Sequence, residues 1–157
     1  MIVAELMTEN PVCVELTQPL SEAARLMWEC DCGALPVIDE QQEVRGMLTD
    51  RDVCMATWLQ RSAPQELMVA GVMSERLYYC LPTATLSAAE GLMRTKQVRR
   101  IPILSVDRHL IGILSLADIV KATGVSRDAG LLASEVTLTL ADICRPPLPS
   151  FSRQPSA

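Results

Sequence analysis

The sequence predicts an α/β fold made of two β-α-β-β-α repeats that pack about a pseudo-twofold axis. Two observations lead to this prediction. Residues 3–56 match residues 69–122 without a gap, at a constant offset of 66 positions. Within each copy, apolar segments of strand length alternate with segments of helical period. One such unit is too small to cover its own sheet, so we expect the two copies to pack face to face.

The repeat involves residues of many chemical kinds. Roughly a quarter of the aligned positions are identical, several times the level expected by chance. Matching pairs include Val3/Val69, Met7/Met73, Thr17/Thr83, Leu20/Leu86, Leu26/Leu92, Pro36/Pro102, Gly46/Gly112, Leu48/Leu114, Asp52/Asp118 and Ala56/Ala122. The duplication therefore extends over the whole unit and is not confined to one motif.

A short extended segment opens each copy, at residues 12–14 and 78–80. A threonine follows each segment, at Thr17 and Thr83, and we expect it to cap the next helix. In the first copy this helix is predicted over residues 19–29, where apolar residues recur at helical spacing.

Two apolar runs of strand length come next, at residues 34–38 and 44–48 of the first copy. The polar residues 39–43 join them, so we expect a hairpin. A second helix is predicted to begin near Asp50, which completes the unit.

The repeat also sets the expected domain boundaries. We assign residues 1–62 to the first repeat and residues 63–124 to the second, with residues 60–65 as the linker. Residues 125–157 form a C-terminal tail that we expect to be partly helical, from near Leu131, and then disordered. Four prolines after residue 145 stop any helix there.

Composition narrows the function classes. The formal net charge is −5 and no basic stripe is visible, so no nucleic-acid partner is expected. The N-terminus lacks the order of a signal peptide and no apolar run is long enough to cross a bilayer. We therefore expect a cytoplasmic protein without a membrane partner.

Cysteine and histidine usage argues against a metal site and against catalysis. Six cysteines accompany a single histidine, so no zinc ligand set assembles, and we interpret the cysteines as reduced packing residues. No nucleophile, base and metal come together in the sequence, so the chain is not expected to be an enzyme or to hold a catalytic cofactor.

The most informative motif is a glycine, an apolar strand end, a hydroxyl residue and an aspartate three residues after it. Its residues are Gly46, Thr49 and Asp52 in the first copy, and Gly112, Ser115 and Asp118 in the second. One interpretation is a capping box that satisfies the first amides of a helix. The other is a ligand site, in which the carboxylate accepts ribose hydroxyls and the helix N-terminus binds phosphate. The glycine either lets a ligand or backbone approach closely or marks a bulge.

In these residues the chain resembles the cystathionine-β-synthase (CBS) domain family, whose members are regulatory modules built from paired repeats. The resemblance covers about residues 3–122. It depends on three elements that each occur twice in the same order. They are the pairs Met7-Thr8 and Met73-Ser74, the strands with Leu35-Pro36-Val37 and Ile101-Pro102-Ile103, and the two Gly-x-x-(Thr/Ser)-x-x-Asp segments.

The resemblance implies an adenosine-type ligand, namely AMP, ADP, ATP or S-adenosylmethionine, in the cleft between the repeats. It implies that Asp52 and Asp118 hold ribose, and that Thr49 and Ser115 touch ribose or phosphate. The adenine would lie between the extended segment (Val12 and Cys13, or Tyr78) and the residues that precede Pro36 or Pro102 in the strand. The candidate ligand-binding residues are Val12, Cys13, Ala34, Leu35, Thr49, Arg51, Asp52, Tyr78, Arg100, Ile101, Ser115 and Asp118.

Charge distinguishes the two copies. Arg99 and Arg100 stand where the first copy has glycine and alanine, and Arg51 stands where the second copy has alanine. Planar guanidinium groups suit phosphate oxygens, so we favour Arg100 as a phosphate contact and consider Arg51 for the same role. The alternative is a solvated helix end, which explains Lys96 well. We expect two clefts of different charge, of which one or both bind ligand.

The resemblance also implies a homodimer formed through helices. Met55, Trp58 and Leu59 are candidates for that interface or, equally, for the core. The predicted function is a regulatory module that senses an adenosine-type nucleotide and signals to an unidentified protein partner. The alternative is a structural dimerisation or scaffold module with vestigial nucleotide sites.

Overall fold

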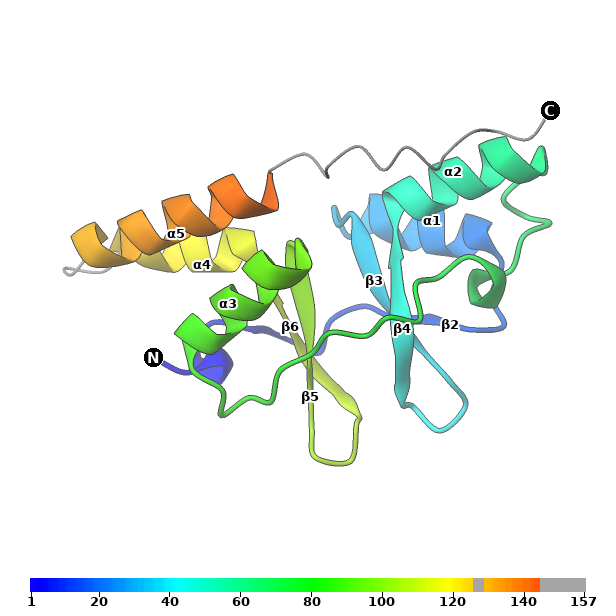
Figure 1. Cartoon of the computed structure of the whole chain (residues 1–157). Helices are drawn as coiled ribbons and strands as arrows, with labels where there is room; N and C mark the ends of the chain where they lie inside the picture. Colours follow the sequence, from blue (N-terminus) through cyan, green and yellow to red (C-terminus); the bar gives the residue numbers. More distant parts are fainter. Residues whose placement is uncertain (126–128, 145–157) are drawn as a thin grey trace.

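The structure is a computed structural model that describes residues 1–125 and 129–144 (Figure 1). Its elements in chain order are the 3-10 turn η1 (Val3–Glu5), β1 (Thr8–Glu9), β2 (Val14–Glu15), α1 (Leu20–Glu29), β3 (Ala34–Ile38), β4 (Val44–Thr49), α2 (Asp50–Gln60), the 3-10 turn η2 (Val69–Gly71), α3 (Leu86–Lys96), β5 (Arg100–Leu104), β6 (Leu110–Ser115), α4 (Leu116–Val125) and α5 (Ala129–Ile143).

Two small sheets form the centre of the protein, one with the strand order β2-β3-β4 and one with the order β1-β6-β5. Each contains an antiparallel hairpin, β3–β4 or β5–β6, as the sequence predicted. The segment before the first helix of each copy runs parallel to the first strand of the hairpin, β3 or β5. It forms β2 in the first copy and a single bridge between Cys80 and Ile103 in the second. The predicted α/β fold with two repeats is confirmed.

The pairing pattern reveals the pseudo-twofold axis directly. Thr8 pairs with Ile113, and the equivalent pair at the 66-residue offset, Ser74 with Met47, is also formed. At the tips of the two hairpins Glu43 pairs with His109. His109 is the residue of the second copy that corresponds to Glu43 at the 66-residue offset. A residue pair that maps onto itself lies on the axis, so the axis passes between the two hairpins.

The first segment of each copy crosses to the sheet of the other copy. We call residues 3–9 and 69–75 the crossing segments. Val3 is fully buried in the core of the second repeat, and Val69 is fully buried in the core of the first. The amide of Val3 donates to the carbonyl of Ala84 at 2.9 Å, and the N-terminus accordingly lies near α3 in Figure 1. Each core is therefore completed by the other repeat.

The two glycines of the repeated motif make room for these crossing segments. A β-carbon on Gly46 would lie 2.4 Å from the carbonyl oxygen of Ser74, and one on Gly112 would lie 2.6 Å from the sulfur of Met7. The sequence left two explanations for Gly46, a close approach by ligand or backbone and a strand bulge. The structure shows the close approach of backbone, and it also shows a register shift in the strand pairing next to Gly46. Neither glycine is needed to admit a ligand.

The expected threonine caps are wrong. Helix α1 begins after Pro19, which makes no side-chain capping bond. Helix α3 begins after Thr85, whose Oγ1 accepts a hydrogen bond from the amide of Ala88 at 3.2 Å. The N-caps are therefore Pro19 and Thr85, two residues after Thr17 and Thr83. Both have extended backbone, so the extended segment continues up to the start of each helix.

Helix α5 packs against α3 and α4 and extends the core of the second repeat (Figure 1). Val136 and Ile143 are buried in that core. The equivalent helix face of the first repeat has no such cover within the described residues, and Trp28 and Trp58 are 88% and 70% exposed there. The predicted disorder of the last dozen residues concerns positions outside the described residues.

The six cysteines form no disulfide with one another, and they differ in environment. Cys80 is buried and Cys13 is half-buried, and burial raises the pKa of both thiols. Cys30, Cys54 and Cys144 are exposed, so the expected packing role is wrong for these three. No helix within residues 1–125 and 129–144 combines the length and apolarity needed to cross a bilayer.

Asp39 ties together the turn of the first hairpin. Its Oδ1 accepts hydrogen bonds from the amides of Gln41 and Glu43, both at 2.9 Å, and its Oδ2 accepts one from Arg45. Burial alone would raise the pKa of the Asp39 carboxyl, but these hydrogen bonds and the Arg45 charge outweigh it and hold the pKa below its ordinary value.

Asp39→Asn is therefore expected to destabilise the protein at neutral pH and to do so less in acid. A lowered folded-state pKa gives stability that is present above the ordinary aspartate pKa of about 4 and is lost as the pH falls through the folded value. Denaturant unfolding of both proteins over the acidic range in which they fold measures the difference in free energy of unfolding. A difference that stays constant with pH contradicts this expectation.

Candidate functional site

The site begins where β4 ends and α2 starts. Thr49 is extended, and its Oγ1 accepts a hydrogen bond from the amide of Asp52 at 3.2 Å. The Asp52 Oδ2 in turn accepts from the amide of Thr49 at 2.9 Å and from its hydroxyl at 2.7 Å. This is a capping box, so that interpretation of the motif holds. The hydrogen bonds of this carboxylate within the described residues all use Oδ2, which leaves Oδ1 for a ligand.

The second copy of the motif has the same geometry. Asp118 Oδ2 accepts from the Ser115 amide at 2.9 Å and from its hydroxyl at 2.6 Å, and the Asp118 amide donates to Ser115 Oγ at 3.2 Å. Because the two caps are alike, the cap alone does not indicate which copy binds a ligand. The surroundings of the caps must decide.

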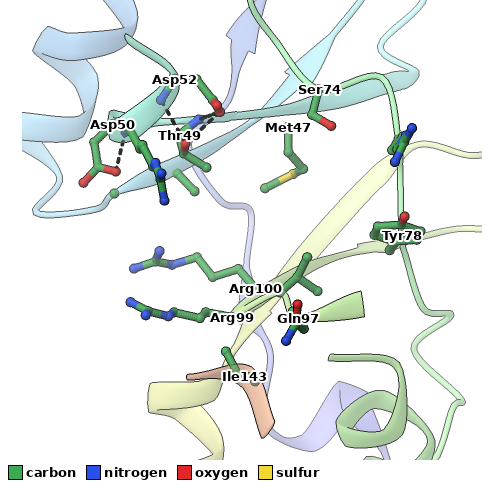
Figure 2. Close-up of a pocket in the computed structure, with 15 residues that line it drawn as sticks. Met47, Thr49, Asp50, Asp52, Ser74, Tyr78, Gln97, Arg99, Arg100 and Ile143 are labelled. Carbon is green, nitrogen blue, oxygen red and sulfur yellow. Dashed lines mark hydrogen bonds between the residues drawn. The ribbon is translucent and has the colours of Figure 1, made fainter. Parts of the chain in front are cut away.

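Those surroundings differ because a cavity of about 570 Å³ opens beside the first cap (Figure 2). We call it the main cleft. It lies between the α2 start and the residues that lead into β5, so both repeats contribute. It is lined by Gly33, Ala34, Met47, Thr49, Asp50, Arg51, Asp52, Ser74, Arg76, Tyr78, Gln97, Val98, Arg99, Arg100 and Ile143. A volume of this size suits a small-molecule ligand.

Six of the twelve candidate residues meet in the main cleft. They are Ala34, Thr49, Arg51, Asp52, Tyr78 and Arg100. The other six do not line it; they are Val12, Cys13, Leu35, Ile101, Ser115 and Asp118. The main cleft therefore combines the motif of the first copy with the arginine of the second, which is the mixed composition that the resemblance implied.

Burial explains why some candidates are absent from the lining. Leu35 and Ile101 are 1% and 0% exposed and belong to the two hydrophobic cores, so their side chains are not available to a ligand. Cys13 packs between the repeats beside Ile38 and Leu104. Val12 is 40% exposed and stands at the position equivalent to Tyr78, so the symmetry of the repeat relates it to the second motif and not to the first.

Cations lie on several sides of the main cleft. Figure 2 shows the Arg99 and Arg100 side chains extending side by side toward the end of the cleft where Asp50 lies. Arg100 Nη1 is 3.8 Å from the point where a β-carbon on Gly33 would sit. Lys96 Nζ lies 5.2 Å from the centre of the Tyr78 ring, a cation–π contact that adds to the helix-end explanation of Lys96.

The C-terminal helix α5 closes one end of the main cleft. Ile143 lines it, and the neighbouring carbonyl of Asp142 accepts a hydrogen bond from Gln97 Nε2 at 3.3 Å. Arg94 forms an ion pair with the Asp142 carboxylate at 3.7 Å. A ligand in the cleft would thus be in contact with residues that hold α5 in place.

Sequence reasoning missed several lining residues. Ser74 could have been found, since it belongs to the repeated Met-Ser pair, but its role follows only from the crossing segment that pairs it with Met47. Arg76 carries no local signal, because its equivalent in the first copy is Asn10. Ile143 lies outside the repeat altogether and could not be placed by it.

Comparison with known proteins identifies the repeat. The sequence pattern of the CBS domain matches residues 3–58 and again residues 69–124. The chain is 36% identical over 135 residues to the CBS domain-containing protein YhcV of Bacillus subtilis, and the match covers 86% of this chain and 94% of that protein. It also matches the hypoxic response protein 1 of Mycobacterium tuberculosis at 32% identity over 117 residues, covering 74% of this chain and 81% of that protein.

A solved structure gives the same result. The crystal structure of CBSX2 in complex with AMP superposes with a TM-score of 0.67 and 25% identity, covering 77% of this chain and 94% of that one. Within residues 1–125 and 129–144, no three histidine, cysteine or acidic side chains gather in a way that could hold a metal ion.

Proposed function

Because the chain belongs to the CBS domain family and carries two such domains, we propose that it is a regulatory module that binds an adenosine-type ligand in the main cleft. The ligand is AMP, ADP, ATP or S-adenosylmethionine. The module acts by binding, without catalysing a reaction. The observation that supports the proposal most is the meeting of the Thr49–Asp52 cap with Arg100 across a cavity of ligand size.

The proposed roles follow from the chemistry of the lining. Asp52 Oδ1 accepts the ribose hydroxyls, while Thr49 keeps the carboxylate in place and presents its own hydroxyl. Arg51 stands at the start of α2, where the helix N-terminus favours a phosphate. Arg100 binds phosphate from the opposite wall, and Ala34 and Tyr78 flank the base.

The surroundings of Asp118 are a second candidate site, by the symmetry of the repeat. Ser115 and Asp118 form its cap, and Val12 and Cys13 are assigned to it as the equivalents of Tyr78 and Tyr79. The side chains of Leu35 and Ile101 are buried, so only their backbone is available to a ligand. We expect the main cleft to bind more tightly, because the second motif has Ala117 where the first has an arginine.

Signalling requires that the ligand prefers one conformation over another, since an equilibrium shifts only by the difference in affinity for its two states. We propose that α5 is the responding element, because Ile143 lines the cleft and Gln97 and Arg94 hold the residue before it. The partner is a separate protein in the cytosol, and the module dimerises through the exposed face of α1 and α2.

The scaffold alternative has an observation in its favour. Trp28, Trp58 and Leu59 are 88%, 70% and 66% exposed on α1 and α2, and Met55 is 39% exposed. Exposed apolar groups of this size commonly mark an interaction surface. For Met55, Trp58 and Leu59 the sequence left two roles open, in an interface or in the core. Their exposure favours the interface, because an exposed side chain does not belong to the core of the single chain.

A thermal-shift screen of ligand-free protein tests the proposed function. At about 100 times the dissociation constant, a ligand adds about 2.7 kcal/mol to the free energy of unfolding, which raises Tm by several degrees for a chain of this size. We expect such a rise with at least one of AMP, ADP, ATP and S-adenosylmethionine, and none with GTP. No rise with any adenosine compound, in protein shown by mass spectrometry to be ligand-free, would favour the scaffold function instead.

A further inference from the structure

The lining of the main cleft has an unusual charge for this protein. The whole chain has a formal net charge of −5, yet the lining contains four arginines and only two aspartates. The arginines are Arg51, Arg76, Arg99 and Arg100. One of the two carboxylates, Asp52, already shares its Oδ2 with the helix cap. The cleft is therefore a local positive region in an acidic protein.

None of these arginines forms a direct ion pair within the described residues, and Asp50 is the acidic side chain of the lining that lies near Arg100. Among the described residues, ion pairs within 4.0 Å are formed by Arg25, Arg45 and Arg94, and by none of the four arginines of the cleft. Like charges gathered without partners repel one another and destabilise the folded state. An anion bound among them would remove that repulsion.

The duplicated fold does not require these charges. The counterparts of Arg51, Arg76, Arg99 and Arg100 in the other repeat are Ala117, Asn10, Gly33 and Ala34. The first repeat folds with neutral residues at three of these positions, and the second keeps the same cap at Ser115 beside Ala117. Among these counterparts Asn10 alone has left-handed backbone, where φ is 48°. The four arginines are thus specific to one cleft, which points to its ligand and not to the packing of the repeat.

The four guanidinium groups carry more positive charge than one phosphate carries negative charge. A terminal phosphate has a charge of about −1.5 to −2 at neutral pH, so it does not balance four arginines by itself. Arg99 and Arg100 extend side by side into the cleft (Figure 2), and Arg51, at the start of α2, also belongs to the lining. Two or three linked phosphates add further negative charge and further oxygens. S-adenosylmethionine offers one carboxylate together with an ammonium and a sulfonium cation, so it brings no net negative charge.

We propose that the main cleft selects its ligand by charge and binds adenosine nucleotides with a di- or triphosphate chain, in preference to AMP and against S-adenosylmethionine. This inference depends on the proposed function, because it concerns the ligand of the same site. Arg99 and Arg100 are the principal groups that determine the specificity, with Arg51 and Arg76 contributing positive potential.

Calorimetric titration of ligand-free protein in magnesium-free buffer tests the selection. The compounds are adenosine, AMP, ADP, ATP, S-adenosylmethionine and inorganic tripolyphosphate. We expect the affinity to rise by about ten-fold from AMP to ADP, since hydrogen bonds between charged groups have that magnitude, and to rise again with ATP. S-adenosylmethionine should bind more weakly than AMP, and tripolyphosphate more weakly than ATP.

Variants assign the effect to the arginines. The double variant Arg99→Ala/Arg100→Ala should bind ADP and ATP no more tightly than the parent binds AMP, with the affinity for adenosine unchanged. Arg100→Lys should fall between, because lysine keeps the charge and loses the two-bonded geometry. Arg108→Ala, an exposed arginine in the second hairpin, is the matched control and should leave the whole series unchanged. Circular dichroism and Tm verify that each variant is folded.

The outcomes separate this inference from the proposed function. Equal affinities for AMP, ADP, ATP and S-adenosylmethionine would overturn the charge selection and leave the adenosine site intact. If the affinity of the double variant still rises from AMP to ADP and ATP as in the parent protein, the role of the two arginines is overturned. If tripolyphosphate binds as tightly as ATP, or if no adenosine compound binds, the proposed function itself is overturned.

Discussion

Asp52→Ala is expected to weaken the binding of adenosine nucleotides in the main cleft by roughly 10- to 100-fold. The carboxylate is the proposed acceptor for the ribose hydroxyls, and hydrogen bonds to a charged group contribute about 1.5–3 kcal/mol. Isothermal titration of the ligand that gives the largest thermal shift measures the change in Kd.

The control for this variant is Asp118→Ala. Asp118 Oδ2 accepts the same two hydrogen bonds from Ser115 that Asp52 Oδ2 accepts from Thr49, so both variants lose the carboxylate half of a capping box and keep the N-cap hydroxyl. Only Asp52 lines the main cleft. Equal losses of affinity in the two variants would mean that the effect comes from the cap, and would contradict the assigned role of Asp52.

Gly46→Ala is expected to lower the free energy of unfolding by at least about 2 kcal/mol. The new β-carbon would lie 2.4 Å from the backbone oxygen of Ser74, so the crossing segment 69–75 would have to move away from β4. That segment holds Val69 in the core of the first repeat, so its displacement disturbs packing as well. Denaturant unfolding measures the loss, and Tm should fall by roughly 5–10 °C for a chain of this length.

Two other glycines provide the comparison. At Gly112 the nearest atom is the side-chain sulfur of Met7 at 2.6 Å, which can move more easily than backbone, so Gly112→Ala should destabilise less than Gly46→Ala. At Gly91, inside α3, nothing lies within 4 Å, and alanine there should stabilise the protein by about 1 kcal/mol. A different order among the three variants would contradict the explanation by crossing segments.

The sequence predicted most of the local structure because its signals are local. Strand β3 occupies the expected residues 34–38, and α2 begins at Asp50 as expected. The hairpins follow from short apolar runs joined by polar turns, and the pseudo-twofold arrangement follows from the repeat. Each of these depends on residues that are close together in the chain or related by a fixed offset.

The exchange of the crossing segments could not be predicted, because the repeat does not determine which of the two cores each segment joins. Val3 and Val69 are identical residues at equivalent positions, so their hydrophobicity shows that they are buried but not in which core. The prediction of the helix caps was wrong for a different reason. Both Thr83 and Thr85 are good capping residues, and the choice depends on where the preceding chain pairs with the N-terminal segment, as in the bridge between Ile2 and Thr85.

The candidate site was predicted in part. The Thr-x-x-Asp motif identified Thr49 and Asp52, but it could not separate a cap from a ligand site, and the structure shows that both copies are caps. What distinguishes them is the group of arginines on one side, which comes together only through the contact of the two repeats. The contribution of Ile143 depends on the position of α5. The apolar residues of α5 indicate that this helix packs against the protein, but they do not indicate against which surface.

The central claim is that the main cleft is where an adenosine nucleotide binds. Titration of isotope-labelled, ligand-free protein with ADP, followed by amide chemical shifts, tests it most directly. We predict saturable changes that are largest at Gly33 and Ala34, from Thr49 to Asp52 and from Gln97 to Arg100, with much smaller changes around Ser115 and Asp118. Saturable shifts centred on Ser115 and Asp118 instead, or the absence of any saturable shift, would contradict the claim.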